Sequence, residues 1–438
     1  MKRRKYLLAC LLAGVTIAMP AGQLSFAAGA QNDISLMAES ESQSETQSES
    51  QSESETQSES QSESQSESET QSESQSESQS ESETQSESQS ESEKESETET
   101  QDPNVPEGYK GIYKVSDLSL LSSKPDGKYM LMADLDLNSA EQASISVFRG
   151  TLDGNNHTIK GLKHALFQVL EEGTVSNLNL SSVQISGSGD AGALANVIGT
   201  GKKSAVTIQN ITITGSVTGT GNTGSLAGVL KGTDIVISRI ANSATVAGTA
   251  NAGGLIGLVQ ATDDQEGAAS VKLTESYNIG EVSAVTAGGL IGAAEIPNLA
   301  AARNIEIANC YNAGVLEKGA NIVAKITAGN GQVVINKCVG IQFYYSVASG
   351  MVGTSTMAAG STQTSGCSIS NSYYYSMNPV YAFETGNCIT GTATALNDVQ
   401  IKTQSYFKDF DFDGIWALNA AENGGYPYLK QTTMLPVS

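Results

Sequence analysis

The sequence is poor in the residue types that most often carry catalysis and metal binding. Its 438 residues include two histidines, five cysteines and one tryptophan, and aromatic residues make up 5% of the chain. So few histidines leave little capacity for acid–base chemistry, and no C-x-x-C pair indicates a zinc site. No basic patch is present that would bind nucleic acid. We therefore expect no catalytic residues, no metal, no cofactor and no nucleic-acid partner.

The net charge of −23 is unevenly distributed along the chain. Residues 39–100 hold 20 Glu and one Lys, a net of −19, in a Ser/Glu/Gln/Thr repeat without aromatic or aliphatic side chains. Such a segment cannot bury enough surface to offset chain entropy. We therefore predict a disordered spacer over residues 31–105. Because serine is abundant there, a glycosylated or ligand-binding tract is the alternative interpretation.

The first 30 residues have the three parts of a secretory signal peptide. Basic residues at 2–5 precede an apolar segment over 6–19, and Ala28-Gly29-Ala30 fits a cleavage site. No later segment reaches the roughly 18 apolar residues that a membrane helix needs. We expect the mature protein to be secreted, or held at the cell surface, with no transmembrane segment.

The chain becomes periodic after residue 170, and the period predicts the fold. An Ala-Gly-small-Leu landmark, with Thr at its first position once, recurs at residues 191–195, 223–227, 252–256 and 287–291, a spacing of about 30 residues that is typical of solenoids. Between the landmarks apolar residues alternate with polar ones, as in β-strands. Because one unit is too small to bury its own apolar face, the units must stack. The sequence predicts an all-β, right-handed parallel β-helix.

We expect both ends of this β-helix to be covered. The sequence V-S-D-L-S-L-L at Val115–Leu121 predicts a short N-terminal capping helix, and the segment Phe410–Leu429 is expected to close the other end. The predicted organisation divides the chain into five parts. These are a signal peptide (1–30), a spacer (31–105), a cap with the first coils (106–170), the repeats (171–397) and a C-terminal capping coil with a tail (398–438).

The repeats resemble a known family of bacterial surface proteins. The Ala-Gly-Gly-Leu-Ile-Gly units at 252–257 and 287–292 resemble GLUG repeats. The segments Gly150–Ile159 and Gly425–Leu429 look like the opening and closing parts of such proteins. The resemblance implies a right-handed parallel β-helix in an adhesin-like context, without catalytic residues. It leads us to expect a non-enzymatic, secreted or surface protein that binds host or environmental ligands.

Two motifs could carry chemistry against this expectation. The sequence D-F-D-F-D-G at Asp409–Gly414 matches half of a calcium-binding EF-hand loop, but Ala420 stands where the bidentate Glu would be. We interpret it as a strand that closes the core, with calcium as the alternative. Neither His157 nor His164 belongs to an H-E-x-x-H motif, which is relevant because similar repeats can precede metallopeptidase domains.

The enzymatic alternative is a β-helix polysaccharide lyase or glycoside hydrolase. These enzymes need clustered carboxylates on one face of the solenoid, and no carboxylate recurs at one position of successive coils. The predicted ligand surface is instead aromatic and would bind a glycan or a protein; the oligomeric state stays open. Its residues are Tyr344, Tyr345, Tyr373, Tyr374 and Tyr375.

A set of small residues is expected inside the core. Ser276, Cys310, Cys338 and Ser372 occupy the same position of consecutive units. We predict that they form a buried ladder with unpaired thiols, because stacked side chains in register lie wider apart than a disulfide requires.

Overall fold

The computed structural model describes residues 102–140, 143–200, 204–232, 234–261, 269–298, 302–316, 318–341, 347–375, 388–433 and 435. The predicted signal peptide and the predicted spacer up to residue 101 lie outside these residues. No helix in the described part of the chain is long and apolar enough to cross a membrane.

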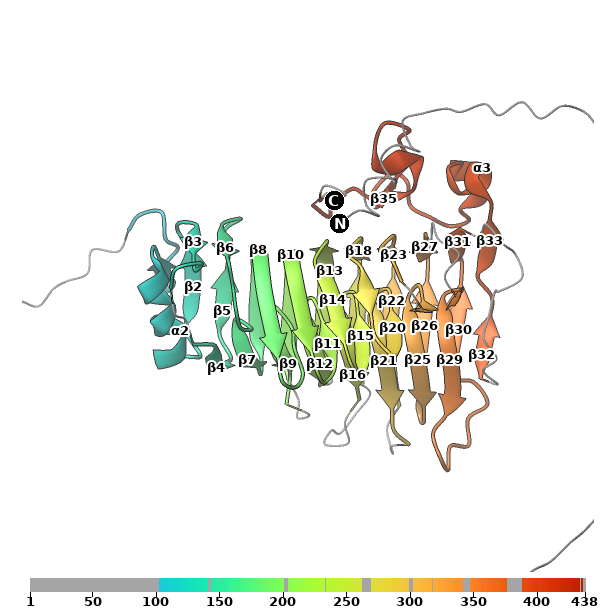
Figure 1. Ribbon diagram of the computed structural model, residues 1–438, viewed down its shortest axis with the longest axis horizontal. Coiled ribbons are helices and arrows are strands. Elements are labelled where there is room, and N and C mark those ends of the chain that lie inside the picture. The colour runs from blue at the N-terminus through green and yellow to red at the C-terminus, as the bar shows by residue number, and fades with distance from the viewer. Residues whose placement is uncertain are drawn as a thin grey trace, which may run out of the picture. The chain divides into compact units, whose positions relative to one another are not determined.

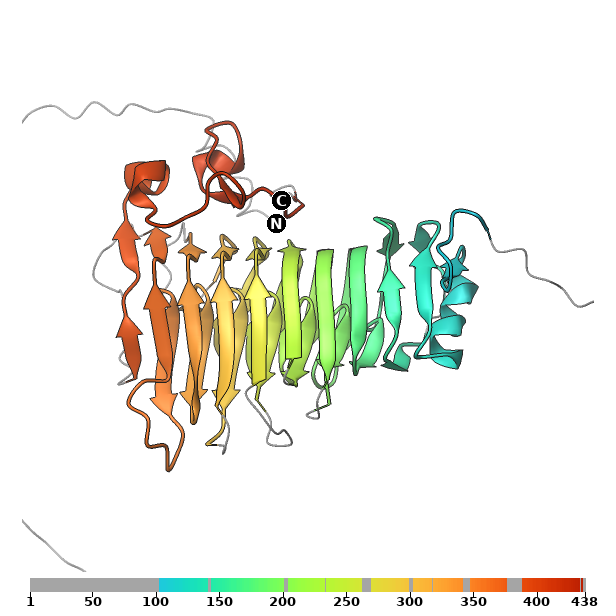
Figure 2. The same cartoon turned by 180° about the vertical axis from the view of Figure 1, so that it is seen from behind.

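The described residues form the predicted all-β parallel β-helix, in which each coil adds strands to the same sheets (Figures 1 and 2). Equivalent residues of successive coils pair in parallel register and lie 22 to 35 residues apart in the sequence. On one face they are Ile145, Phe167, Ala195, Ala227, Ile256, Ile291, Val323 and Val352. The predicted period of about 30 residues is therefore confirmed.

The largest sheet runs along the whole solenoid; two parallel rows of strands recur along it, and the central coils add a third row. Its strands are β1 (Lys110–Ile112), β2 (Lys128–Leu131), β3 (Leu135–Asp136), β5 (Thr151–Asp153), β6 (Thr158–Lys160), β8 (Gly173–Gly187), β10 (Ala205–Gly219), β13 (Asp234–Asn242), β14 (Thr245–Gly248), β17 (Ala269–Thr274), β18 (Tyr277–Asn278), β19 (Val282–Ser283), β22 (Arg303–Ala308), β23 (Tyr311–Asn312), β26 (Gly331–Asn336), β27 (Val339–Gly340), β30 (Cys367–Ser370), β31 (Tyr373–Tyr375), β32 (Ile389–Gly391) and β33 (Thr394–Leu396).

Two smaller sheets complete the cross-section. The second sheet faces the first across the core and contains β4 (Ile145–Phe148), β7 (Phe167–Leu170), β9 (Ala195–Ile198), β12 (Ala227–Lys231), β16 (Ile256–Gln260), β21 (Ile291–Ile296), β25 (Val323–Ala328) and β29 (Val352–Met357). The third contains β11 (Thr223–Gly224), β15 (Asn251–Gly253), β20 (Thr286–Gly288), β24 (Lys318–Ala320) and β28 (Val347–Ser349).

The N-terminal end has the predicted helical cap. The 3-10 helix η1 (Val115–Leu118) runs directly into the α-helix α2 (Ser119–Ser123). Leu118 and Leu121 are buried in the main core, and Tyr129 donates its hydroxyl proton to the carbonyl of Lys124 at 2.7 Å. The cap therefore continues the apolar interior instead of leaving it open at the first coil.

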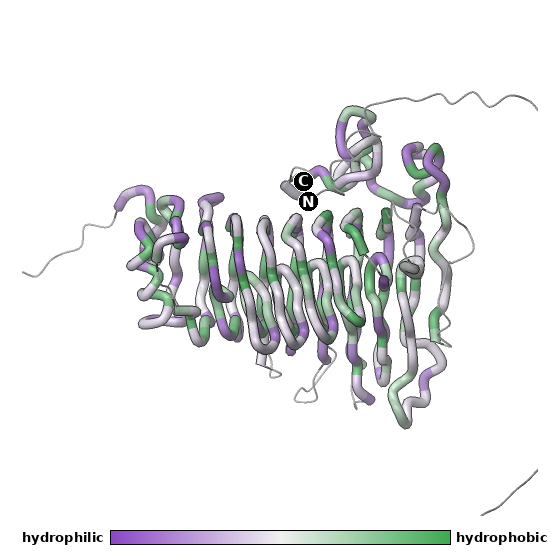
Figure 3. The backbone as a smooth tube through the Cα atoms, viewed as in Figure 1, coloured by the Kyte–Doolittle hydropathy of each residue, from purple (hydrophilic) through white to green (hydrophobic). Residues whose placement is uncertain are grey.

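A single left-handed residue bends each of seven successive coils between the first two rows of the largest sheet. In β10 the inward residues Ile208 and Ile211 are three apart, and Asn210 between them has φ = 55°. That conformation interrupts the strict alternation of inward and outward residues along the strand. Aliphatic side chains on both sides of the bend therefore point inward. Figure 3 shows apolar residues recurring along the coils. The same position is left-handed in seven consecutive coils: Asn177, Asn210, Arg239, Glu275, Asn309, Lys337 and Asn371.

The glycines of the repeated landmark are required by close backbone contacts. A Cβ atom on Gly253 would overlap the carbonyl oxygen of Ile256, and one on Gly288 would overlap that of Ile291. The following glycines face a second obstacle, because a side chain on Gly289 would strike the amide of Asn312. The landmark glycines therefore permit the tight turn through which the chain enters the second sheet.

The amide against which Gly289 packs belongs to a ladder of fully buried asparagines. Asn242 donates an Nδ2 hydrogen to Asn278 Oδ1 at 2.7 Å, and Asn278 donates likewise to Asn312 at 2.9 Å. Each of the three is 0% exposed and also bonds to nearby backbone groups. Because these polar groups are paired, the ladder avoids the cost of burying unsatisfied amides.

The landmark glycines provide a direct test of this packing. We expect Gly288→Ala to lower the free energy of unfolding by about 3 kcal/mol or more, because the added carbon meets backbone that cannot move without breaking the stack. Gly189→Ala is the matched control, since no heavy atom lies within 4 Å of its added Cβ. Thermal unfolding followed by circular dichroism measures both, and equal melting temperatures would contradict the proposed role of Gly288.

Candidate functional site

One outward position of the solenoid changes character along its length. It lies two residues after the left-handed bend, and successive coils place there Asn179, Thr212, Ala241, Tyr277, Tyr311, Val339 and Tyr373. We call this row the flank. It is polar in the first coils and becomes apolar and aromatic from Ala241 onward. The rings of Tyr277 and Tyr311 stack with centroids 4.8 Å apart.

The aromatic half of the flank is covered by the chain's own C-terminal segment. Residues 397–435, which we call the strap, contain α3 (Asp398–Ile401), η2 (Gln404–Tyr406), β34 (Trp416–Ala417), η3 (Asn423–Gly425) and β35 (Tyr428–Leu429). The strap lies along the later coils in both ribbon views (Figures 1 and 2). Its helix α3 packs against the final strands β31 and β33, and its residues Phe407 and Phe410 pack on Tyr373 of β31. The predicted capping coil is therefore also a lateral cover, because the same segment reaches Tyr311 through Trp416 and Tyr277 through Thr433 and Leu435.

The strap has an apolar core of its own, separate from the core of the solenoid. Trp416 is fully buried, its ring centroid lies 4.9 Å from that of Phe410, and its Nε1 donates to Asn309 Oδ1 at 3.2 Å. At the far end of the strap, the Tyr277 hydroxyl donates to the Thr433 carbonyl and accepts from the Leu435 amide, each at 2.8 Å. Burial raises the pKa of Tyr277 to about 12, so the phenol stays neutral in these bonds.

The predicted aromatic ligand surface is largely occupied by packing. Tyr344 and Tyr345 lie outside the described residues. Tyr373 points outward, as alternation requires, but Phe407 and Phe410 of the strap cover it, and Tyr374 points into the main core; each is 6% exposed. Tyr375 is partly exposed beside Tyr426. Ligand binding by these tyrosines stays a prediction, and Tyr373 and Tyr374 lack the exposed surface that it needs.

The acidic motif in the strap forms a turn, and the expected strand is absent at residues 409–414. The Asp411 carboxylate accepts hydrogen bonds from the amides of Asp413 at 3.0 Å and Gly414 at 2.8 Å. Phe410 and Phe412 both join the aromatic core of the strap, so they do not alternate across a sheet. A carboxylate that bonds to its own backbone is an Asx turn, and this local bonding was missed in the strand interpretation.

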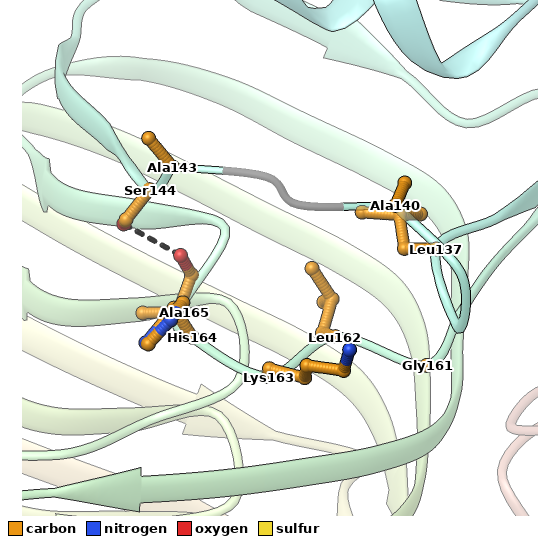
Figure 4. Close-up of a pocket in the computed structure, with 9 residues that line it drawn as sticks. All are labelled: Leu137, Ala140, Ala143, Ser144, Gly161, Leu162, Lys163, His164 and Ala165. Carbon is orange, nitrogen blue, oxygen red and sulfur yellow. Dashed lines mark hydrogen bonds between the residues drawn. The ribbon is translucent and has the colours of Figure 1, made fainter.

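The two histidines occupy separate surroundings near the first coils. His157 Nδ1 lies 3.0 Å from Asp134 Oδ1, and the same oxygen accepts from the Thr158 amide at 2.8 Å. The Thr158 amide and, secondarily, His157 lower the pKa of the Asp134 carboxyl. His164 lies at a cavity of about 580 Å³ whose lining is mostly alanine, leucine and glycine (Figure 4). Within the described residues no three His, Cys, Asp or Glu side chains are grouped as metal ligands.

The predicted ladder of small residues is confirmed. Ser276, Cys310, Cys338 and Ser372 are at most 1% exposed, and both thiols are unpaired. The Cys310 thiol donates to the Ala308 carbonyl at 3.2 Å, and the Ser372 hydroxyl accepts from the Cys338 amide at 3.1 Å. Burial raises the pKa of Cys310 well above its usual range. Both thiols are therefore structural, because each is fully buried and out of reach of a reaction partner.

Comparison with known proteins points to a peptidase family. Residues 111–215 match the family model of the M26 IgA1-specific metallo-endopeptidase N-terminal region. Immunoglobulin A1 proteases of Streptococcus sanguinis and Streptococcus pneumoniae (strain ATCC BAA-255 / R6) are each 34% identical over 116 residues, covering 24% of this chain and 6% of the relative. A crystal structure described as an immunoglobulin A1 protease candidate from Bacteroides ovatus is 19% identical, covering 74% of this chain and 92% of that one, with a TM-score of 0.45.

These matches correct three expectations drawn from the sequence. The resemblance to GLUG repeats is wrong, because the family model that matches is that of the M26 N-terminal region and the relatives include immunoglobulin A1 proteases. The expectations of a non-enzymatic, adhesin-like function and of no enzymatic activity are contradicted by the same finding, because the matched family model and the immunoglobulin A1 proteases are those of peptidases, although this chain spans only 6% of the length of those relatives. The alternative of a polysaccharide lyase or glycoside hydrolase finds no support either. The match lies in residues 111–215, which include the opening segment Gly150–Ile159 on which part of the resemblance rested.

The buried ladder predicts how one of its members responds to substitution. Cys338→Ser should change the free energy of unfolding little, whereas Cys338→Leu should lower it by about 1 to 3 kcal/mol, because the larger side chain overpacks a position that takes only small residues. Chemical denaturation measures both variants. Rapid labelling of Cys310 and Cys338 in the native protein by a bulky thiol reagent would contradict their burial.

The packing of the strap can be followed through its only tryptophan. Tyr311 lies beneath Trp416, with ring centroids 6.3 Å apart. We expect Tyr311→Ala to shift the Trp416 emission to longer wavelength and to lower stability by roughly 3 kcal/mol, because it leaves a cavity against the indole. Tyr113→Ala is the control, since Tyr113 is 45% exposed in the first coils. An unchanged emission spectrum in the Tyr311 variant would show that the strap does not depend on this contact.

Proposed function

We propose that this chain acts in the proteolysis of an extracellular protein substrate, as the β-solenoid region of an M26-type endopeptidase, with immunoglobulin A1 as the candidate substrate. The observation that carries the proposal is the match of residues 111–215 to the N-terminal region of that family. In the structure these residues form one continuous unit. It contains the helical cap, the first coils and β10 as far as Gly215.

The solenoid supports a role in recognising the substrate. Its strands are held in register by continuous backbone pairing, which gives a surface that loses little conformational entropy on binding. Within the matched unit the outward side chains include hydrogen-bonding groups that repeat from coil to coil, such as Asn177 and Asn210, whose amides bond at 2.8 Å. A protein substrate could be oriented on such a surface. The predicted signal peptide is consistent with export to the cell exterior, where the protein would encounter an antibody.

The first test measures binding and cleavage together. The full chain is incubated with immunoglobulin A1, and with immunoglobulin G as the control, with and without added Zn²⁺. Binding is followed by biolayer interferometry and cleavage by gel electrophoresis and mass spectrometry. We expect binding to immunoglobulin A1 at least 10-fold tighter than to immunoglobulin G. Cleavage would additionally place hydrolysis in this chain. If immunoglobulin A1 is neither bound nor cleaved, the proposal is overturned.

A second test locates the contact. Hydrogen–deuterium exchange of the full chain, with and without immunoglobulin A1, should show slower exchange confined to residues within 111–215. The later coils under the strap provide an internal control, because the same solenoid backbone is there covered by residues 397–435. Protection restricted to the later coils would mean that the matched unit is not the recognition surface.

A further inference from the structure

Two cysteines of the final coils lie where neighbouring strands bring them side by side. Cys367 begins β30 and pairs in register with Ile389 of β32, the residue that follows Cys388. The Cys367 amide donates to the Cys388 carbonyl at 3.0 Å. A strand separation of about 4.8 Å combined with an offset of one residue places the two Cα atoms about 6 Å apart. That separation is within the range of disulfide-bonded cysteines.

Both side chains point into the same part of the core. Cys367 is 0% exposed and Cys388 is 2% exposed. Cys388 lies just before β32. Strand alternation would point it outward if it belonged to β32, but it does not apply to a residue outside the strand. In the reduced state its sulfur lies 2.9 Å from the buried Ser355 hydroxyl, which faces it from β29. Cys388 can therefore turn either toward Ser355 or toward Cys367 inside one buried space.

The other two cysteines form a natural comparison. Cys310 and Cys338 stand at the same position of consecutive coils, so their Cβ atoms point in parallel about 4.8 Å apart. Disulfides need Cβ atoms nearer to about 3.8 Å with converging directions. Cys388 is offset by one residue from Ile389, the partner of Cys367. The side chains of Cys367 and Cys388 are therefore not forced into the parallel arrangement that keeps Cys310 and Cys338 apart.

We propose that Cys367 and Cys388 form a disulfide in the exported protein, while Cys310 and Cys338 stay reduced. The two thiols lose two protons and two electrons to the disulfide of an exported thiol–disulfide oxidoreductase or of glutathione, which is reduced to two thiols as the Cys367–Cys388 bond forms. Formation occurs during folding, before the core closes around the sulfurs. The inference does not depend on the proposed function.

The bond would fasten the last described coil to the coil before it. β32 and β33 follow Cys388 directly, and the strap starts at Asn397, which caps α3 through bonds to the Val399 and Gln400 amides. A disulfide that closes the loop between Cys367 and Cys388 restricts the conformations of the unfolded chain. The disulfide would thus covalently hold the coil from which the strap starts. This is the last described coil, which pairs with a neighbouring coil on one side only.

Peptide mapping of the full, exported chain tests the assignment. The protein is denatured without reductant, alkylated, digested and analysed by mass spectrometry. We expect a cross-linked peptide pair joining Cys367 to Cys388, with Cys310 and Cys338 alkylated. Alkylation of all four, or a Cys310–Cys338 bridge, would overturn the proposal. Wild-type protein is sufficient for this measurement, so it does not depend on how a variant folds.

Matched variants test the stabilising effect. Reduction should lower the melting temperature of the wild type and of Cys310→Ser by about 5 °C, but should not change that of Cys367→Ser. Refolding of the reduced chain with glutathione disulfide should restore the higher value together with the cross-linked peptide. If reduction shifts Cys367→Ser as much as the wild type, the bond between these two cysteines is not the cause.

Discussion

The structure depends on the left-handed residue that bends each coil of the main sheet. Without it, a strand of the length of β8 or β10 would continue straight, and its inward residues would stay strictly alternate. With it, the aliphatic residues on both sides of the bend enter one core, and the chain turns a corner in a single step. Asparagine adopts this conformation at little cost, whereas Arg239, Glu275 and Lys337 adopt it at a cost of about 1 kcal/mol each. In-register pairing with the neighbouring coils must offset that cost.

Because the bend recurs in register, every position of a coil becomes a ladder, and each ladder must be chemically consistent along the solenoid. Aliphatic ladders form the core, and the asparagine ladder places paired amides at the end of the second row of strands. The flank is the exception, since it changes from Asn179 and Thr212 to Tyr277 and Tyr311. A row of stacked tyrosines on the outside of a sheet requires a cover, and the strap provides it.

Local regularities could be predicted from the sequence, and distant contacts could not. The period, the parallel stacking, the helical cap and the buried Ser/Cys ladder all follow from residues within one or two repeats. The strap could not be placed in this way, since Thr432 bonds to the carbonyl of Glu275 across 157 positions and Trp416 bonds to Asn309 across 107. One signal was available, because a tyrosine directly follows the small residue of the buried ladder in three units and alternation points it outward. Tyr277, Tyr311 and Tyr373 therefore indicated either a ligand surface or a covering segment.

The functional interpretation failed for a physical reason that applies to other solenoids. The Ala-Gly-Gly-Leu-Ile-Gly unit is dictated by backbone contacts, since Gly253 and Gly288 meet carbonyl oxygens and Gly289 meets an amide of the asparagine ladder. Any chain that makes this turn in this way must use similar residues, so the motif reports a turn geometry and carries little information on descent or activity. Residues 111–215 are less regular, include the cap, and precede most of the landmarks. Similarity over residues 111–215 is therefore not explained by the landmark turn alone, because this range holds only the first of the four landmarks.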